Sequence, residues 1–182
     1  MPAKSGHPEI AVGLTIFKVS LSLVGIALIA GALGIRVNTS SSLPLGLYVR
    51  TQSESAALIE FCPTEPFASL SRTRGYRTRG FACRDGAVPL LKPIIAIEGD
   101  TVVVSPQGIA VNGRHLPKTK AMTADAAGRT LTPWPNGMYR VARGTVWVAS
   151  TYNRGSYDSR YMGPIDIRHI RRRLRPLWLL NG

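Results

Sequence analysis

One serine and one lysine, far apart in the chain, have the side chains of a hydrolytic dyad. Ser42 lies between an apolar N-terminal segment and a bend that Pro44 and Gly46 favour, so the serine is expected to be displayed rather than packed. Lys92 lies in a run of mostly apolar residues. Burial in such a run lowers the pKa of a lysine, and a neutral amine can remove the proton of a serine hydroxyl. The two residues therefore indicate a peptidase with Ser42 as nucleophile and Lys92 as base.

Each residue taken alone also has an ordinary structural interpretation. Serine–proline turns are common in loops, and an isolated lysine in a strand usually lies on the solvent face. The residues around Lys92 weaken the second interpretation, because Leu90, Leu91, Ile94 and Ile95 make both faces of the expected strand apolar. We therefore expect the amine to be partly desolvated.

The polar run from Tyr152 to Pro164 is the third stretch that could take part in chemistry. It places Asp158, Ser159 and Arg160 at successive positions. One interpretation is a polar turn with a local Asp–Arg pair, which contributes little to stability if it is exposed. The other is a brace, in which the Ser159 hydroxyl or the Asp158 carboxylate orients the lysine amine.

The apolar segment at residues 10–35 predicts a transmembrane anchor. Its one charge, Lys18, lies near its start, where a long side chain can reach the membrane interface. Together with Lys4, this lysine predicts that residues 1–9 stay in the cytoplasm and that residues 36–182 form an extracytoplasmic domain. A cleaved signal peptide is the alternative, but the apolar run is longer than the usual hydrophobic region of such a peptide.

The net charge of +13 is concentrated in part in two arginine clusters, at residues 72–79 and 168–175. The first cluster is rich in Gly and Thr and predicts a solvated loop. The second predicts a basic strand or tail close to anionic lipid. No motif typical of RNA or DNA binding accompanies either cluster, so nucleic acid is not expected as a partner.

The two cysteines, Cys62 and Cys83, predict a disulfide, because an even number of cysteines in an exported domain favours pairing. Two buried thiols are the alternative. The bond would close a loop of about twenty residues and contribute roughly 3 kcal/mol. Because the cysteines are far apart with no histidine near them in sequence, we expect no zinc site, and the sequence indicates no metal and no other cofactor.

Beyond residue 36, short apolar runs alternate with turn residues, which predicts a mostly β catalytic domain folded as a barrel or as packed sheets. The runs begin at Gly46, Ala57, Pro93, Thr101, Gly108, Met138 and Thr145. Pro106-Gln107-Gly108 predicts a turn, and Asn112-Gly113 predicts a type I′ hairpin. Residues 118–136 are expected to form a loop or a short helix, and the sequence has no long amphipathic helix beyond the anchor and no internal repeat.

In this order behind one apolar segment, the stretches that carry Ser42, Lys92 and Asp158 resemble the signal peptidase I superfamily of Ser/Lys peptidases. Within it they resemble the TraF branch, whose members mature a conjugative pilin subunit. Residues 38–48 are similar to the nucleophile box, residues 91–100 to the general-base box, and residues 157–163 to the last box. The hairpin at residues 111–113 and the cysteine pair are also similar to features of these proteins.

The resemblance implies a signal-peptidase-like β domain in which neutral Lys92 activates Ser42 and an acyl-enzyme forms. It also implies that the Ser42 N–H, helped by the Ser40 hydroxyl, stabilises the oxyanion. The supporting residues that it implies are Asp158, Ser159 and Arg160. Water then ends the reaction or, as in the TraF branch, the N-terminal amine of the pilin attacks and gives a cyclic product.

The implied setting is the inner membrane, crossed once, with the catalytic domain in the periplasm. The implied partners are a prepilin or leader-peptide substrate in the membrane, the conjugative transfer machinery and anionic lipid. The chain departs from the general enzymes at three places: Ser41 has their spacing to Pro44, Pro93 stands where an arginine usually follows the lysine, and residues 45–48 replace the threonine that follows the proline. A general leader peptidase and a non-catalytic structural component of a conjugative secretion apparatus stay open as alternatives.

Overall fold

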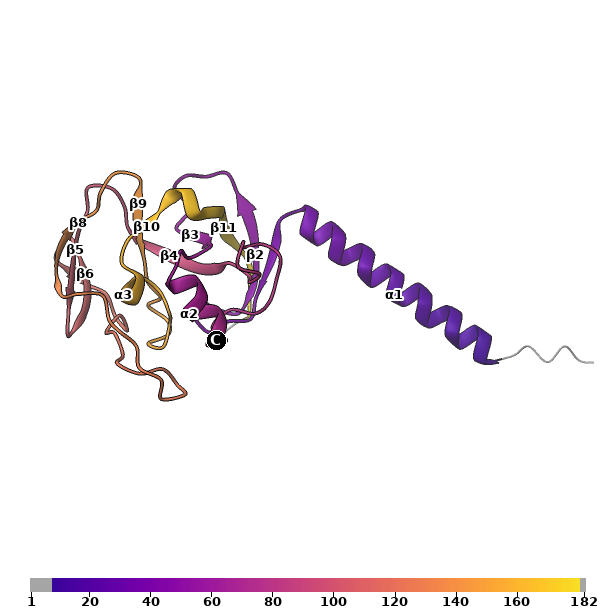
Figure 1. Ribbon diagram of the computed structural model, residues 1–182. Coiled ribbons are helices and arrows are strands. Elements are labelled where there is room, and N and C mark those ends of the chain that lie inside the picture. The colour runs from indigo at the N-terminus through magenta and orange to yellow at the C-terminus, as the bar shows by residue number, and fades with distance from the viewer. Residues whose placement is uncertain (1–7, 181–182) are drawn as a thin grey trace, which may run out of the picture.

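The computed structural model describes residues 8–180, which form one long helix and a body rich in β-strands (Figure 1). The helix, α1 (Pro8–Ala32), projects away from the strands, and its large apolar side chains such as Phe17 and Leu21 are exposed. Within residues 8–180, no helix combines the length and the hydropathy that crossing a membrane requires. The anchor expected at residues 10–35 therefore stays a prediction, and residues 1–7 of the expected cytoplasmic segment lie outside the described part.

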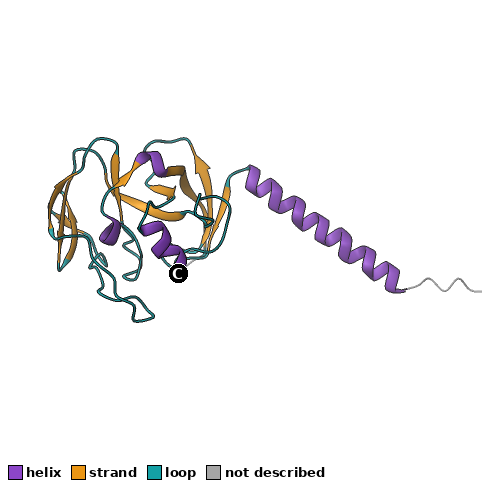
Figure 2. Ribbon diagram, in the orientation of Figure 1, coloured by secondary structure: helices purple, strands orange, loops and turns teal. Residues whose placement is uncertain are grey.

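The body consists of short strands and three short helical segments joined by long loops (Figure 2). In chain order these are β1 (Ile35–Asn38), β2 (Gly46–Thr51), β3 (Leu58–Phe61), α2 (Phe67–Thr73), β4 (Leu90–Ala96), β5 (Thr101–Ser105), β6 (Gly108–Val111), β7 (Arg114–His115), β8 (Gly137–Arg140), β9 (Thr145–Val148), α3 (Ser159–Met162), β10 (Ile165–Asp166), η1 (Ile167–His169) and β11 (Ile170–Leu179). The mostly β fold predicted from the sequence is confirmed.

The strands form two antiparallel sheets. The larger has seven strands in the order β1-β2-β11-β3-β4-β9-β10, and the smaller has four in the order β7-β6-β5-β8. β11 follows the other strands in the chain, yet it lies inside the larger sheet, where it pairs with β2 on one side and with β3 on the other. The basic strand or tail expected at residues 168–175 is therefore mostly part of an interior strand.

Local sequence explains the smaller sheet. In β5 the side chains alternate, with Val102 and Val104 buried, as expected for a strand with one face on a core. The hairpin between β6 and β7 turns at Asn112 and Gly113, with φ angles of 50° and 80°. Positive φ at both positions is what a type I′ turn requires, so the predicted hairpin is confirmed. Residues 118–136 form turns with one isolated bridge.

The buried apolar side chains form three clusters, and the smallest one positions the chemistry. It contains Leu43, Tyr48, Leu91 and Leu174. Leu43 directly follows Ser42, and Leu91 directly precedes Lys92, so packing between them holds the two segments together. The neighbours expected to desolvate Lys92 are mixed in burial: Leu90 and Leu91 are buried, and Ile94 and Ile95 are partly buried.

Cys62 and Cys83 form the disulfide that was expected from their number, with their Cα atoms 5.7 Å apart. The bond connects the residue after β3 to the loop that leads from α2 to β4. That loop is also held by a buried Arg77, which pairs with Asp85 and donates from Nε to Ser71 Oγ at 2.8 Å. The segment that precedes the lysine strand is thus fixed from two directions.

Replacing both cysteines should lower the free energy of unfolding by about 3 kcal/mol, because the open chain regains the entropy of a loop of about twenty residues. Denaturant unfolding of Cys62→Ser/Cys83→Ser against the unreduced wild type measures the difference. Peptidase activity at low temperature should be unchanged, since the disulfide does not contact Ser42 or Lys92. An unchanged midpoint and slope of unfolding would contradict the expected stabilisation.

Candidate active site

Ser42 and Lys92 meet in the structure. Ser42 lies in the turn between β1 and β2, and Lys92 lies in β4. The Lys92 Nζ and the Ser42 Oγ are 2.6 Å apart, within hydrogen-bond distance. Both side chains are nearly buried, with exposed fractions of 8% for Ser42 and 4% for Lys92. The expectation that Ser42 would be displayed rather than packed is therefore wrong. The geometry therefore joins a hydroxyl and an amine that are mostly shielded from water.

The turn that carries Ser42 is organised by the buried side chain of Asn38. Its Nδ2 donates to the carbonyl oxygens of Ser40, Leu43 and Pro44, at 3.0, 3.3 and 3.1 Å. The Tyr48 hydroxyl also donates to the Pro44 carbonyl, at 2.7 Å. These bonds satisfy carbonyl groups that a tight turn cannot pair within itself, so the serine is presented by a rigid loop.

Burial changes the protonation of the lysine. Desolvation lowers the pKa of Lys92 from its ordinary value of 10.5 to about 8, because a charged amine loses its hydration. Two charged neighbours have smaller effects on this pKa: the Asp158 carboxylate raises it, and the Arg160 guanidinium lowers it. The neutral form of the amine, which a general base requires, is therefore far more populated near neutral pH than in an exposed lysine, and it makes up half of the amine near pH 8.

A second serine, Ser156, also contacts the amine, and the sequence analysis did not single it out. Lys92 Nζ donates to its Oγ at 2.9 Å, and Ser156 is 2% exposed. The signal available in the sequence was its place in the same polar run as Asp158. Two hydroxyls thus fix the amine, one from the turn between β1 and β2 and one from the loop before α3.

Asp158 and Arg160 form a buried ion pair, and neither the Asp158 carboxylate nor the Ser159 hydroxyl hydrogen-bonds the Lys92 amine as the sequence interpretation expected. Arg160 Nη2 and Asp158 Oδ2 are 2.6 Å apart, and both side chains are almost completely buried. Ser159 Oγ accepts from the backbone N–H of Val148 at 2.9 Å, so this hydroxyl holds β9. Among the described residues, the two hydrogen-bond partners of the amine are hydroxyls of Ser42 and Ser156. Asp158 acts on Lys92 through its charge.

The two serines before Ser42 point elsewhere. Ser41 is exposed, and its Oγ accepts from Asn153 Nδ2 at 2.5 Å. Ser40 is exposed as well, and its Oγ donates to Asn38 Oδ1 at 3.1 Å. Of the three consecutive serines, Ser42 is therefore the one in contact with the lysine, and an oxyanion role for Ser40 stays a prediction.

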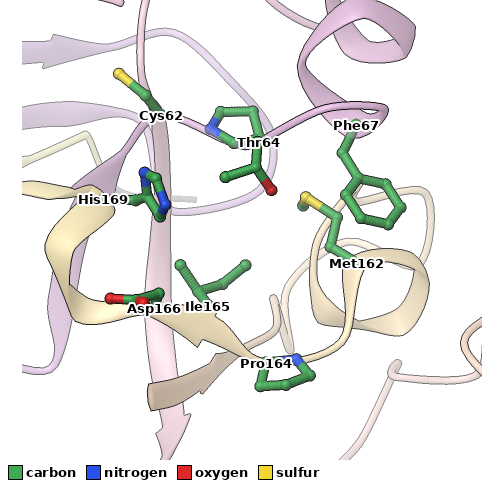
Figure 3. Close-up of a pocket in the computed structure, with 9 residues that line it drawn as sticks. Cys62, Thr64, Phe67, Met162, Pro164, Ile165, Asp166 and His169 are labelled. Atoms are coloured by element: carbon green, nitrogen blue, oxygen red, sulfur yellow. The ribbon is translucent and has the colours of Figure 1, made fainter. Parts of the chain in front are cut away.

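A cavity of about 120 Å³ is lined in part by Cys62, one of the two disulfide cysteines (Figure 3). Its lining includes Cys62, Phe67, Met162, Asp166 and His169, and it includes neither Ser42 nor Lys92. The candidate active site is thus the place where Ser42, in the turn between β1 and β2, contacts Lys92 of β4.

The chain belongs to the family described as signal peptidase, peptidase S26, whose model matches residues 11–178. This family defines it as a serine peptidase of the signal peptidase type.

The chain is also similar to individual proteins whose names refer to plasmid or conjugal transfer. The chain is 36% identical over 174 residues to "Plasmid transfer protein TraF" of Escherichia coli, covering 93% of this chain and 95% of that protein. It is 38% identical over 139 residues to "Probable conjugal transfer protein TraF" of Sinorhizobium fredii, covering 72% and 70%. It is 32% identical over 181 residues to "Conjugal transfer protein TraF" of Agrobacterium tumefaciens, covering 96% and 98%.

A solved structure is also similar. The crystal structure of a signal peptidase I from Enterococcus faecalis aligns with a TM-score of 0.37 at 17% sequence identity, covering 69% of this chain and 99% of that chain.

Activity should rise with pH and reach half its maximum near pH 8, because only the neutral Lys92 amine can accept a proton. Asp158→Asn removes the charge that raises this pKa, so its midpoint should lie at lower pH and its maximal rate should fall. The pH dependence of kcat/KM measures both. Asp166→Asn, which removes a carboxylate paired with exposed Arg168, is the control and should leave the midpoint unchanged. A midpoint near 10.5, or a move to higher pH in Asp158→Asn, would contradict the assignment of the base.

Proposed function

We propose that the protein is a serine endopeptidase in which Ser42 is the nucleophile and Lys92 the general base. The observation that carries the proposal is the 2.6 Å contact between the Ser42 hydroxyl and an amine whose pKa is lowered to about 8. A serine hydroxyl is a weak nucleophile unless an adjacent base removes its proton. The neutral amine accepts a hydrogen bond from Ser42, whereas the protonated amine donates to it.

The proposed reaction has two halves. In the first, the hydroxyl proton passes to Lys92 Nζ as Ser42 Oγ bonds to the substrate carbonyl carbon, and Lys92 then gives that proton to the departing amine. The Ser42 N–H, assisted by Ser40, stabilises the oxyanion. In the second half, Lys92 takes a proton from an incoming water or amine as that group bonds to the acyl carbon. The bond from the acyl carbon to Ser42 Oγ breaks, and Lys92 returns the proton to Ser42 Oγ. Ser156 holds the amine in place through both halves.

The substrate that we propose is the pilin precursor of a conjugative transfer system. The relatives named for plasmid and conjugal transfer, similar over most of their own length, support this setting. The products of the two possible second halves differ in mass. Attack by water leaves a linear mature pilin, whereas attack by the pilin's own N-terminal amine leaves a cyclic pilin lighter by one water.

Ser42→Ala and Lys92→Ala should each abolish processing, and the double variant should be no worse, because residues that act as one unit are strongly non-additive. Lys92→Arg should also fail, since a guanidinium keeps its proton at working pH. Ser41→Ala is the matched control: it removes an adjacent hydroxyl that contacts Asn153 and should change the rate only mildly. Intact mass of the pilin from cells with each variant measures processing and reports which acceptor is used.

Four outcomes would change the proposal. If Ser41→Ala loses activity and Ser42→Ala keeps it, the nucleophile is Ser41 and its assignment to Ser42 is wrong. Full activity of Lys92→Arg would rule out lysine as the base. Normal conjugation with both residues replaced by alanine would favour a non-catalytic structural component, and cleavage of many unrelated leader peptides would favour a general leader peptidase.

We also propose that the domain lies at the outer surface of the cytoplasmic membrane, held by α1 and facing anionic lipid. The support is an apolar row across three neighbouring strands, where Val37, Leu47 and Trp178 are in register. Val37 is 60% exposed and Trp178 is 59% exposed. Tryptophan is enriched at membrane interfaces, and basic residues near it attract anionic lipids. The exposed arginines of β11 lie on one of these strands: Arg171, Arg172 and Arg175.

This location predicts the behaviour of two reporter fusions. A reporter that is active only in the periplasm, joined after Gly182, should be active, and one that is active only in the cytoplasm should be silent. The reverse result would place the domain in the cytoplasm. Recovery of a soluble protein that begins near Gly34 would instead identify residues before it as a cleaved signal peptide.

A further inference from the structure

Ser150 connects the nucleophile to a distant part of the chain. It lies two residues after the end of β9 and is completely buried. Its Oγ donates to the backbone carbonyl of Ser42 at 2.5 Å, across a separation of 108 residues in sequence. This bond holds the peptide group that directly follows the proposed nucleophile.

The direction of the Ser150 hydroxyl is fixed by its other two bonds. A serine hydroxyl has one donor proton and two acceptor lone pairs. The backbone N–H groups of Tyr152 and Asn153 both donate to Ser150 Oγ, each at 3.1 Å. Because these bonds occupy the acceptor positions, the proton is directed to the Ser42 carbonyl.

The backbone of Ser150 is itself attached to the buried ion pair. Its N–H donates to Asp158 Oδ2 at 3.0 Å, and its carbonyl accepts from Arg160 Nη2 at 3.4 Å. The same turn reaches the residue before the nucleophile, because Asn153 Nδ2 donates to Ser41 Oγ. The peptide group after Ser42 and the side chain of Ser41 are thus contacted from one turn, and the contact through Ser150 is the buried one.

We propose that Ser150 is a positioning residue that sets the orientation of Ser42 relative to Lys92, an inference that rests on the proposed function of these two residues. With the carbonyl of Ser42 held, rotation of the backbone at the nucleophile is restricted. Its Oγ is thereby kept 2.6 Å from the amine. Without the bond, Ser42 samples orientations in which the hydroxyl does not meet the base, although binding of the peptide is unaffected.

The test uses full-length protein in detergent with the prepilin of the same transfer system. In Ser150→Ala, kcat should fall by about tenfold to a hundredfold, the loss expected when a reacting group is misplaced by about 1 Å. KM should stay within about twofold of the wild type. The pH midpoint of kcat/KM should not move, because Ser150 does not contact the Lys92 amine. Ser150→Thr, which keeps the hydroxyl, should regain most of kcat.

Ser71→Ala is the matched control for loss of a buried hydroxyl. Ser71 is also completely buried, and its Oγ donates to the Ala68 carbonyl at 3.0 Å and accepts from Arg77. This variant should lose a similar amount of thermal stability and keep the kcat of the wild type. If Ser150→Ala does not fold, Ser150→Cys, which fills the space with a weak donor, is judged by the same criteria.

Each other result overturns an identifiable part of the inference. If kcat of the Ser150 variant equals that of Ser71→Ala, Ser150 does not position the nucleophile. If kcat falls together with a move of the pH midpoint toward 10.5, the site has become hydrated and the role of Ser150 is only structural. If Ser42→Ala, measured in the same assay, is as active as the wild type, the proposed function itself fails and the positioning role fails with it.

Discussion

The buried ion pair between Asp158 and Arg160 is the interaction on which the rest of the site depends. Removing two charges from water is costly, and the cost is offset only when the remaining donors and acceptors are satisfied. The Arg160 donors are satisfied in this way. The guanidinium donates to both oxygens of the Asp158 carboxylate and to four backbone carbonyls, those of Lys118, Ser150, Asn153 and Arg154. The loop before α3 is wrapped around this cation. That loop carries the hydroxyl that contacts the lysine and the hydroxyl that contacts the nucleophile turn.

The same pair explains how Lys92 can lose its proton beside a carboxylate. An unpaired Asp158 would favour the charged amine and keep it protonated. Because Arg160 is bonded to that carboxylate, the two charges act on the lysine in opposite directions, and desolvation has the largest effect on its pKa. The arrangement therefore combines a charged structural element with a lysine whose pKa is lowered to about 8. An uncharged pair in place of Asp158 and Arg160 would not bind the four backbone carbonyls, and it would not have two opposite effects on the pKa of Lys92.

Local sequence was sufficient for the strands and for the lysine, and insufficient for the contacts between segments. Alternating valines predicted β5, the Asn-Gly pair predicted its neighbouring hairpin, and apolar residues on both sides of Lys92 predicted its burial. The interior position of β11 was not predictable, because arginine-rich composition suggests an edge and its pairing partners lie far away in the chain. Sequence analysis chose Ser159 instead of Ser156 as the serine that contacts the lysine, for a similar reason. Which hydroxyl of the polar run faces the lysine depends on how Asp158 caps α3, and spacing does not contain that information.

The place of β11 in the larger sheet has a consequence for the order of assembly. Ser42 lies in the turn between β1 and β2, and Lys92 lies in β4. Within that sheet, β1 and β2 are connected to β4 only through β11 and β3. Because β11 follows the other strands along the chain, a growing polypeptide has the serine and the lysine on separate pieces of sheet until its last strand has been made. Such non-local pairing forms late and slowly. Within this sheet, the strands around Ser42 and the strand of Lys92 are therefore connected only after β11 has been made and has paired.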